Sequence, residues 1–261
     1  MKQLMIRKME NLDYAGTESL NTICSNLSFA GKNLKRIIVT SCTEHEGKSY
    51  LTLQIMQNLA RRGKRVVLVD MDLRRSMLVS RYNMESEGEM MGIAHYLAGY
   101  CGIEDALYET NVYNGYIVPE GRDVSNPIPL INSQDFVDLL NYLSANFDVV
   151  LIDAPPVGLV IDAAEIARMC DGAVFVCEYN RTRRRELSAA KHQIEQSGCR
   201  VLGVIINKVA FDTLSSKKYY NRSYYSRYSS NYYRREGDSK SEKSGKSAKG
   251  GKSSHGGKSE S

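Results

Sequence analysis

Residues 36–49 read RIIVTSCTEHEGKS, a β-branched apolar run that gives way to a polar turn ending in Gly-Lys-Ser. The run Arg36–Ser41 predicts a buried strand, because continuous Val and Ile suit a strand covered on both faces. Residues 47–62 carry a helical apolar pattern, so the Gly-Lys-Ser triplet falls where the strand turns into a helix. Backbone N–H groups and the helix dipole attract an anion at such a junction, which predicts a phosphate-binding loop.

The loop matches only the second half of the nucleotide-binding pattern G-x-x-x-x-G-K-S/T, because Cys42 stands where the first glycine is expected. In such a loop Lys48 would reach the β- and γ-phosphates, and Ser49 would place its hydroxyl on Mg²⁺. A Gly-Lys-Ser triplet alone also occurs on ordinary surface turns. Its place between a strand and a helix is what favours nucleotide binding here.

Two more apolar runs end in carboxylates, VVLVDMDLR over residues 66–74 and FDVVLID over residues 147–153. The carboxyl ends of parallel strands meet at one edge of a sheet, where ligands of α/β proteins bind. Asp70, Asp72 and Asp153 would therefore converge on the lysine of the loop, which makes sense if a divalent cation neutralises them. Turn or helix-cap roles would explain any one of these aspartates but fit poorly all three together.

The remaining pattern alternates apolar runs with amphipathic segments, which predicts an α/β fold of the P-loop NTPase type with a mostly parallel sheet flanked by helices. Strands are expected over residues 36–41, 65–70, 147–153, 172–178 and 201–207, with a weaker one over 114–119. Helices are expected around residues 20–27 and over 47–62, 91–97, 103–107, 135–145, 161–170 and 184–196.

The composition is that of a soluble globular chain, with 42% hydrophobic and 25% charged residues among 261, which excludes a wholly disordered or fibrous protein. Asp153 and Asp162 interrupt the longest apolar stretch, so no membrane span is expected, and the first residues predict no signal peptide. The six cysteines form no C-x-x-C pair and are expected to be reduced rather than bound to a metal or to one another. A cytoplasmic protein is expected.

The charge and the tyrosines are unevenly distributed along the chain. Residues 217–261 hold 12 Lys and Arg against 4 Asp and Glu, a net charge of +8, whereas residues 1–216 have a net charge of −3. Seven of the 17 tyrosines lie between Tyr219 and Tyr233. Ser, Gly and Lys supply 20 of the 26 residues from 236 onward, which predicts disorder. We expect one domain over residues 1–216, a tyrosine-rich segment over 217–235 and a disordered tail over 236–261.

These features together resemble the bacterial tyrosine autokinases of capsule and exopolysaccharide synthesis, in their short cytosolic form. The resemblance rests on GKS, VLVDMDLR, FDVVLIDAPPV, NPIPLINSQDF and the tyrosine-rich C-terminus, and it spans roughly residues 12–233. It implies that the first three segments are the Walker A motif, a second family-restricted Walker motif and Walker B. Partition and septum-site ATPases share these three motifs, and the tyrosine tail separates the kinases from them.

The resemblance also implies roles for single residues, with ATP and Mg²⁺ as cofactors. It implies that Asp70 orients and deprotonates the hydroxyl of the attacking tyrosine. It implies that Asp72 supports the metal shell or positions Lys48, and that Arg74 helps to stabilise the phosphate charge. The implied nucleotide-binding residues are Glu46, Gly47, Lys48, Ser49, Tyr50 and Asn207. The implied metal ligands are Ser49, Asp72 and Asp153. The implied autophosphorylation sites are Tyr219, Tyr220, Tyr224, Tyr225, Tyr228, Tyr232 and Tyr233.

The implied partners are a transmembrane polysaccharide co-polymerase or adaptor, further copies of this chain and a cognate tyrosine phosphatase, with recruitment to the inner face of the membrane through the adaptor. Two departures from the family pattern matter. Glu44 and His45 replace a common Pro-Gly pair, which predicts an altered loop or weaker nucleotide binding. His45 itself is expected to be a solvent-facing loop residue rather than a base. Asn21 and Cys24 replace the two arginines of the family's ring-forming helix.

Three alternatives remain open from the residues. A partition-type ATPase would hydrolyse ATP without forming phosphotyrosine. A catalytically weak nucleotide-binding regulator would dock through its basic tail. The tail could also bind nucleic acid, because it has a positive charge and tyrosines that can stack on bases. The resemblance already accounts for the tyrosines, so no nucleic-acid partner is expected.

Overall fold

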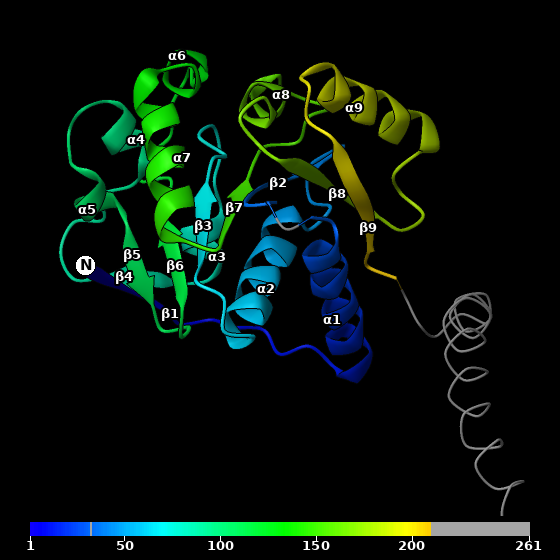
Figure 1. The fold of residues 1–261 in the computed structure, drawn as a ribbon, viewed down its shortest axis with the longest axis horizontal. Helices are drawn as coiled ribbons and strands as arrows, with labels where there is room; N and C mark the ends of the chain where they lie inside the picture. The colour runs from blue at the N-terminus through cyan, green and yellow to red at the C-terminus, as the bar shows by residue number, and fades with distance from the viewer. Residues whose placement is uncertain (32, 210–261) are drawn as a thin grey trace, which may run out of the picture. The chain divides into compact units, whose positions relative to one another are not determined.

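The computed structural model describes residues 1–31 and 33–209, which form the α/β fold drawn in Figure 1. The strands of these residues make one sheet in the order β4-β1-β5-β6-β3-β7-β2-β8-β9. No helix in the described ranges is long and apolar enough to cross a membrane. The tyrosine cluster and the tail after it lie outside the described residues, so the division of the chain at residues 216 and 235 stays a prediction.

Six parallel strands form the body of the sheet, as the continuous apolar runs predicted. They are β6 (Gly115–Val118), β3 (Val66–Asp70), β7 (Val149–Asp153), β2 (Arg36–Ser41), β8 (Gly172–Glu178) and β9 (Val201–Asn207). The register pairs Asp70 with Asp153 at the ends of β3 and β7. The sheet therefore brings the two strand-end carboxylates side by side.

Side chains of the central strands alternate between two apolar layers, because successive residues of a strand point to opposite faces. On β3, Val66 and Leu68 join one layer while Val67 and Val69 join the other. One layer is covered by α1 (Tyr14–Phe29), α2 (Lys48–Arg61) and α3 (Leu78–Arg81) (Figure 1). The other is covered by α4 (Ile93–Leu97), α5 (Ile103–Ala106), α6 (Ile128–Ile131), α7 (Gln134–Asn146), α8 (Asp162–Ala167) and α9 (Arg184–Gln196).

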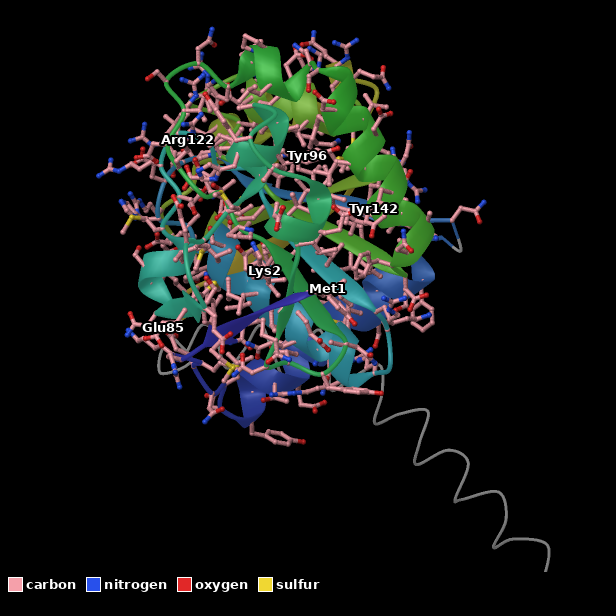
Figure 2. All side chains as sticks on the ribbon, turned by 90° about the vertical axis from the view of Figure 1, so that its left-hand side faces the viewer. Met1, Lys2, Glu85, Tyr96, Arg122 and Tyr142 are labelled. Carbon is pink, nitrogen blue, oxygen red and sulfur yellow. The ribbon has the colours of Figure 1, made fainter. Side chains whose placement is uncertain are left out.

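The far edge of the sheet consists of three short strands, β5 (Tyr108–Thr110), β1 (Lys2–Ile6) and β4 (Met84–Ser86), with antiparallel pairing of β5 to β6 and of β4 to β1. The sequence analysis missed all three strands, together with α3 and α6. Figure 2 views this edge, where Lys2 and Glu85 carry charges. Glu85 lies on the outermost strand, β4, and pairs with Arg7 at 3.0 Å, and charged edge strands disfavour pairing with another sheet.

Helix α1 packs against α2 through the positions where the family's arginines were expected. Cys24 is fully buried, and Asn21 Oδ1 accepts hydrogen bonds from Asn58 at 2.9 Å and Arg62 at 3.2 Å. These two positions of α1 therefore face the interior of this chain or its neighbouring helix.

Candidate functional site

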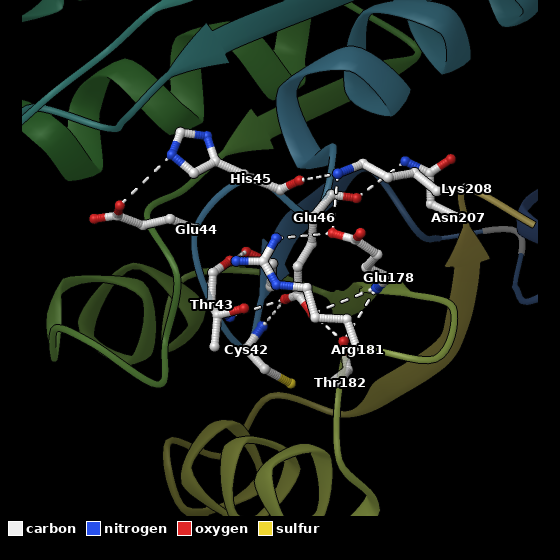
Figure 3. Close-up of polar contacts among 11 residues, drawn as sticks. Cys42, Thr43, Glu44, His45, Glu46, Glu178, Arg181, Thr182, Asn207 and Lys208 are labelled. Carbon is white, nitrogen blue, oxygen red and sulfur yellow. Dashed lines mark hydrogen bonds and ion pairs between the residues drawn. The ribbon is translucent and has the colours of Figure 1, made fainter.

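The loop between β2 and α2 is held from inside by one buried carboxylate (Figure 3). Oε2 of Glu46 accepts hydrogen bonds from the amides of Cys42 and Thr43 at 2.7 and 2.8 Å. Its Oε1 accepts hydrogen bonds from the Thr182 hydroxyl and, at 3.4 Å, from the amide of Glu178. Glu46 is 1% exposed. Its carboxylate thus shapes the loop, and contact with a nucleotide would fall to its backbone amide.

Two residues at the end of β9 also hold the loop through hydrogen bonds. Nδ2 of Asn207 donates to the Glu46 carbonyl at 3.0 Å, and Nζ of Lys208 donates to the His45 carbonyl at 2.6 Å. Gly47 adopts a left-handed φ of 94°, and a Cβ there would lie 2.2 Å from Asn207 Nδ2. Only glycine fits this position without moving Asn207. Asn207, which the resemblance implies as a nucleotide-binding residue, supports the loop in this structure.

His45 occupies the left-handed region, with φ of 64°, which costs a non-glycine residue roughly 1–2 kcal/mol. Its side chain is 80% exposed and lies 3.9 Å from Glu44. The expectation of a solvent-facing loop residue is confirmed. The loop therefore has a left-handed conformation at position 45, one that glycine adopts more readily than histidine.

Lys48 turns inward and meets the strand-end carboxylates. Its Nζ lies 3.0 Å from Asp72 Oδ2, 3.6 Å from Asp153 Oδ1 and 3.3 Å from Ser49 Oγ. Burial by itself lowers the pKa of Lys48, but Asp153 and Asp72 outweigh it and the pKa is raised. The predicted convergence of lysine and carboxylates is thus present, and the lysine stays charged.

Asp70 lies deepest in this cluster and is fully buried. Burial, reinforced by the charge of Asp153, raises the pKa of Asp70 to about 7. The Ser76 hydroxyl donates a hydrogen bond to Asp70 Oδ2. Burial also raises the pKa of Asp153. A carboxylate that titrates near neutral pH is suited to accepting a proton at that pH.

The oxygen atoms of Ser49, Asp72 and Asp153 fit the donor set that Mg²⁺ prefers. Asp153 Oδ1 is buried and accepts no hydrogen bond from the described residues. No three His, Cys, Asp or Glu side chains in the described ranges form a metal site by themselves. Mg²⁺ is usually held by one or two carboxylates together with water and substrate phosphates.

Two predicted residues have other partners in the structure. The guanidinium of Arg74 forms a two-point contact with buried Asp162, at 2.7 Å from Nε and 3.0 Å from the second nitrogen. Tyr50 is partly buried against an apolar cluster of α1 and α2. Sequence reasoning missed Asp162 and Ser76, because neither ends a predicted strand, and it also missed Glu120, which follows the weak strand candidate.

Comparison with known proteins places the chain in a family. Residues 37–246 match the CobQ/CobB/MinD/ParA nucleotide binding domain. The chain is 38% identical over 193 residues to the tyrosine-protein kinase CpsD of Streptococcus agalactiae serotype Ia, with 74% of this chain and 82% of that protein covered. The chain belongs to the bacterial tyrosine autokinases. The kinase therefore carries a nucleotide-binding domain of this P-loop group.

Solved structures agree with this placement. The BceF tyrosine kinase domain superposes on the kinase with a TM-score of 0.66 at 31% identity, covering 74% of this chain and 77% of that one. The septum site-determining protein MinD of Pyrococcus horikoshii, solved with Mg-ADP, gives a TM-score of 0.56 at 24% identity over 66% of this chain and 70% of that one. The second likeness shows the fold alone. The predicted fold and family are both confirmed.

Proposed function

We propose that the kinase transfers the γ-phosphoryl group of ATP to tyrosines of its own C-terminal cluster and thereby regulates capsule or exopolysaccharide synthesis. The observation that carries this proposal is the meeting of Lys48, Asp70, Asp72 and Asp153 beside the phosphate-binding loop. The kinase relatives support it over the partition-type ATPase. The acceptor tyrosines are Tyr219, Tyr220, Tyr224, Tyr225, Tyr228, Tyr232 and Tyr233.

Phosphoryl transfer requires the protein mainly to align the tyrosine oxygen with the γ-phosphate and to neutralise charge on the transferring group. A tyrosine oxygen attacks the γ-phosphorus, the bond to the ADP oxygen breaks, and the tyrosine proton passes to Asp70. A free tyrosine has a pKa of about 10 and needs such an acceptor at neutral pH. Lys48, held 3.0 Å from Asp72, is positioned to neutralise charge on the transferring group. Arg74 is proposed to add charge at the phosphate once it extends from Asp162.

Ser49, Asp72 and Asp153 would hold Mg²⁺, which when bound neutralises phosphate charge. The nucleotide would contact the loop and the start of α2 at Glu46, Gly47, Lys48, Ser49 and Tyr50. Asn207 would reach the base with its Oδ1, while its Nδ2 keeps the hydrogen bond to the Glu46 carbonyl. Mg-ADP in a protein of the same fold supports this pairing of nucleotide and metal.

We propose three protein partners on the strength of the family. These are a transmembrane polysaccharide co-polymerase or adaptor that recruits the kinase from the cytoplasm to the inner face of the membrane, further copies of the kinase and a cognate tyrosine phosphatase. Because Asn21 and Cys24 are engaged within the chain, copies would have to associate without the family's usual arginine pairs on α1.

The test is incubation of the full chain with Mg-ATP, with the activating segment of the adaptor present, followed by intact mass. The proposal predicts steps of one phosphate, up to seven, that disappear when the cluster tyrosines are changed to phenylalanine. ATP hydrolysis without any mass increase would favour the partition-type ATPase. Neither hydrolysis nor a mass increase would favour the nucleotide-binding regulator.

A further inference from the structure

A fourth acidic side chain lies beside the site and has no role in the mechanism above. Glu120 follows β6, whose register with β3 pairs Val118 with Val69, so Glu120 continues the chain alongside the end of β3. The residue is 8% exposed. Its Oε1 accepts no hydrogen bond from residues 1–31 or 33–209.

The surroundings of Glu120 are acidic. Burial raises the pKa of Glu120 to about 8, and the charges of Asp70, Asp123 and Asp72 act in the same direction. Asp123 is exposed and lies within hydrogen-bonding reach of Glu120. Leaving a buried carboxyl oxygen without a partner is unfavourable, so packing alone gives no reason for glutamate at this position.

The nearby cations of the described chain are engaged elsewhere. Lys48 pairs with Asp72, and Arg74 pairs with Asp162. Arg122 lies at the surface, 4.9 Å from the centre of the Tyr100 ring (Figure 2). No ion pair within the described ranges reaches Glu120, so a cation that pairs with its carboxylate would come from a ligand.

The tyrosine cluster offers such cations at a regular spacing. Six of its seven tyrosines have a Lys or Arg two positions away, drawn from Lys217, Lys218, Arg222, Arg227, Arg234 and Arg235. Side chains two apart lie on the same side of an extended segment. Tyr228 is the exception, since serines stand two positions from it on both sides.

We propose that Glu120, with Asp123 at its rim, is the subsite that binds the Lys or Arg two positions from the acceptor tyrosine. The subsite lies next to Asp70, so one extended segment can place its tyrosine at the base and its cation at Glu120. This inference rests on the proposed function. It narrows the substrates of the kinase to tyrosines that have a Lys or Arg two positions away in the sequence. Glu120 is a binding residue in this scheme, not a proton acceptor.

The test uses synthetic peptides of residues 215–236, in native form and with the six cations replaced by glutamine, phosphorylated by the full-length kinase. For the native enzyme, the glutamine peptide should have a KM about tenfold higher, as expected for loss of a charged hydrogen bond. Glu120→Gln should raise the KM of the native peptide to that level and remove the difference between the peptides. Glu109→Gln, at an exposed position of β5, is the control for the lost charge and should behave like the native enzyme.

A second readout separates this inference from the proposed function. Binding of the dye-labelled peptides to the Lys48→Met kinase, followed by fluorescence anisotropy, needs no phosphoryl transfer. If the native kinase modifies neither peptide, the proposed function fails, and the difference in binding still tests the subsite. Within the cluster, Tyr228 should be the slowest tyrosine to gain phosphate.

Three results would contradict the proposed subsite. The native kinase could have the same KM and the same affinity for both peptides, or the Glu120→Gln kinase could still prefer the native peptide. Glu120→Gln could also change only the Mg²⁺ concentration that the reaction needs, which would make Glu120 a metal-side residue. If Glu120→Gln unfolds, Asp123→Asn at the exposed rim repeats the test, with an expected KM increase of about twofold to threefold.

Discussion

On the loop side of the site, the carboxylate of Glu46 accepts four hydrogen bonds from the chain itself. On the strand side, by contrast, Asp153 Oδ1 and Glu120 Oε1 accept none from the described residues. Both sides are buried and both carry carboxylates. They differ in how completely the folded chain supplies hydrogen-bond donors to the carboxylate oxygens.

On the loop side, folding alone completes the hydrogen bonds of the carboxylate, whereas on the strand side bound ligands would complete the interactions of the carboxylates. Glu46, Asn207 and Lys208 fix the loop before any anion arrives, so binding a nucleotide need not order it. The strand side has one lysine facing Asp70, Asp72 and Asp153, and in the proposed scheme it would gain cations from Mg²⁺ and from the acceptor segment. Electrostatic catalysis benefits when the groups that receive charge are already in place.

The largest expected effect is loss of phosphoryl transfer in Lys48→Met. Removing the cation that faces the transferring phosphate should lower tail phosphorylation at least about 100-fold. The measurement is phosphotyrosine formation alongside thermal unfolding. Lys64→Met, an exposed change after α2, should leave transfer intact. Undiminished phosphorylation in Lys48→Met would mean that the phosphates bind elsewhere.

On the loop side, Glu46→Gln should destabilise the fold. The amide would point an N–H group at donors that now face a carboxylate, so the free energy of unfolding should fall by roughly 2–4 kcal/mol. Urea unfolding would measure it. Glu44→Gln, half-exposed on the same loop, should change it by less than about 0.5 kcal/mol. Equal values for the two variants would show that the internal carboxylate does not hold the loop.

On the strand side, Asp70→Asn should stabilise the protein at pH 8 in the absence of Mg²⁺ and nucleotide. The pKa of Asp70 is raised from 3.8 to about 7, so the folded state keeps a proton that the unfolded state releases. The stability of the native protein therefore falls as pH rises from about 4 to about 7. Asparagine cannot titrate, and its advantage should be roughly 2–4 kcal/mol at pH 8 and vanish by pH 4. A constant difference across thermal melts at these pH values would contradict the raised pKa.

The smallest expected effect comes from His45→Gly. Glycine removes the cost of the left-handed φ but adds backbone freedom to the unfolded chain, so the gain should be below about 1 kcal/mol. A melting temperature slightly above that of the native protein is expected. A clear loss of stability would mean that the His45 side chain holds the loop.

The elements that could be predicted from the sequence are those determined by a local sequence pattern. Strands β2, β8 and β9 and helix α9 have the predicted bounds, because each carries its own periodic pattern. The strand-end rule also brought Asp70 and Asp153 to one edge. Long-range pairing produced the rest. Leu4 of β1 pairs with Ser86 of β4, which no local signal indicates.

The same limit applies inside the site. The inward role of Glu46 depends on Thr182, which is 136 residues away in the chain, and that of Arg74 depends on Asp162, 88 residues away. A loop motif predicts that a glutamate is present but not which way its carboxylate turns. Glu120 was within reach of strand-end reasoning, since it follows a strand that was predicted weakly.

Hydrogen exchange at single-residue resolution, with and without Mg-ADP, tests the contrast between the two sides most directly. The amides of Cys42 and Thr43, bonded to Glu46, should exchange slowly without nucleotide and change little when Mg-ADP is added. Amides of residues 72–76 should slow when Mg-ADP is added, because ligand binding suppresses local opening of the strand side. Fast exchange at Cys42 and Thr43 that slows only with Mg-ADP would contradict the account, because the nucleotide would then be what forms the loop.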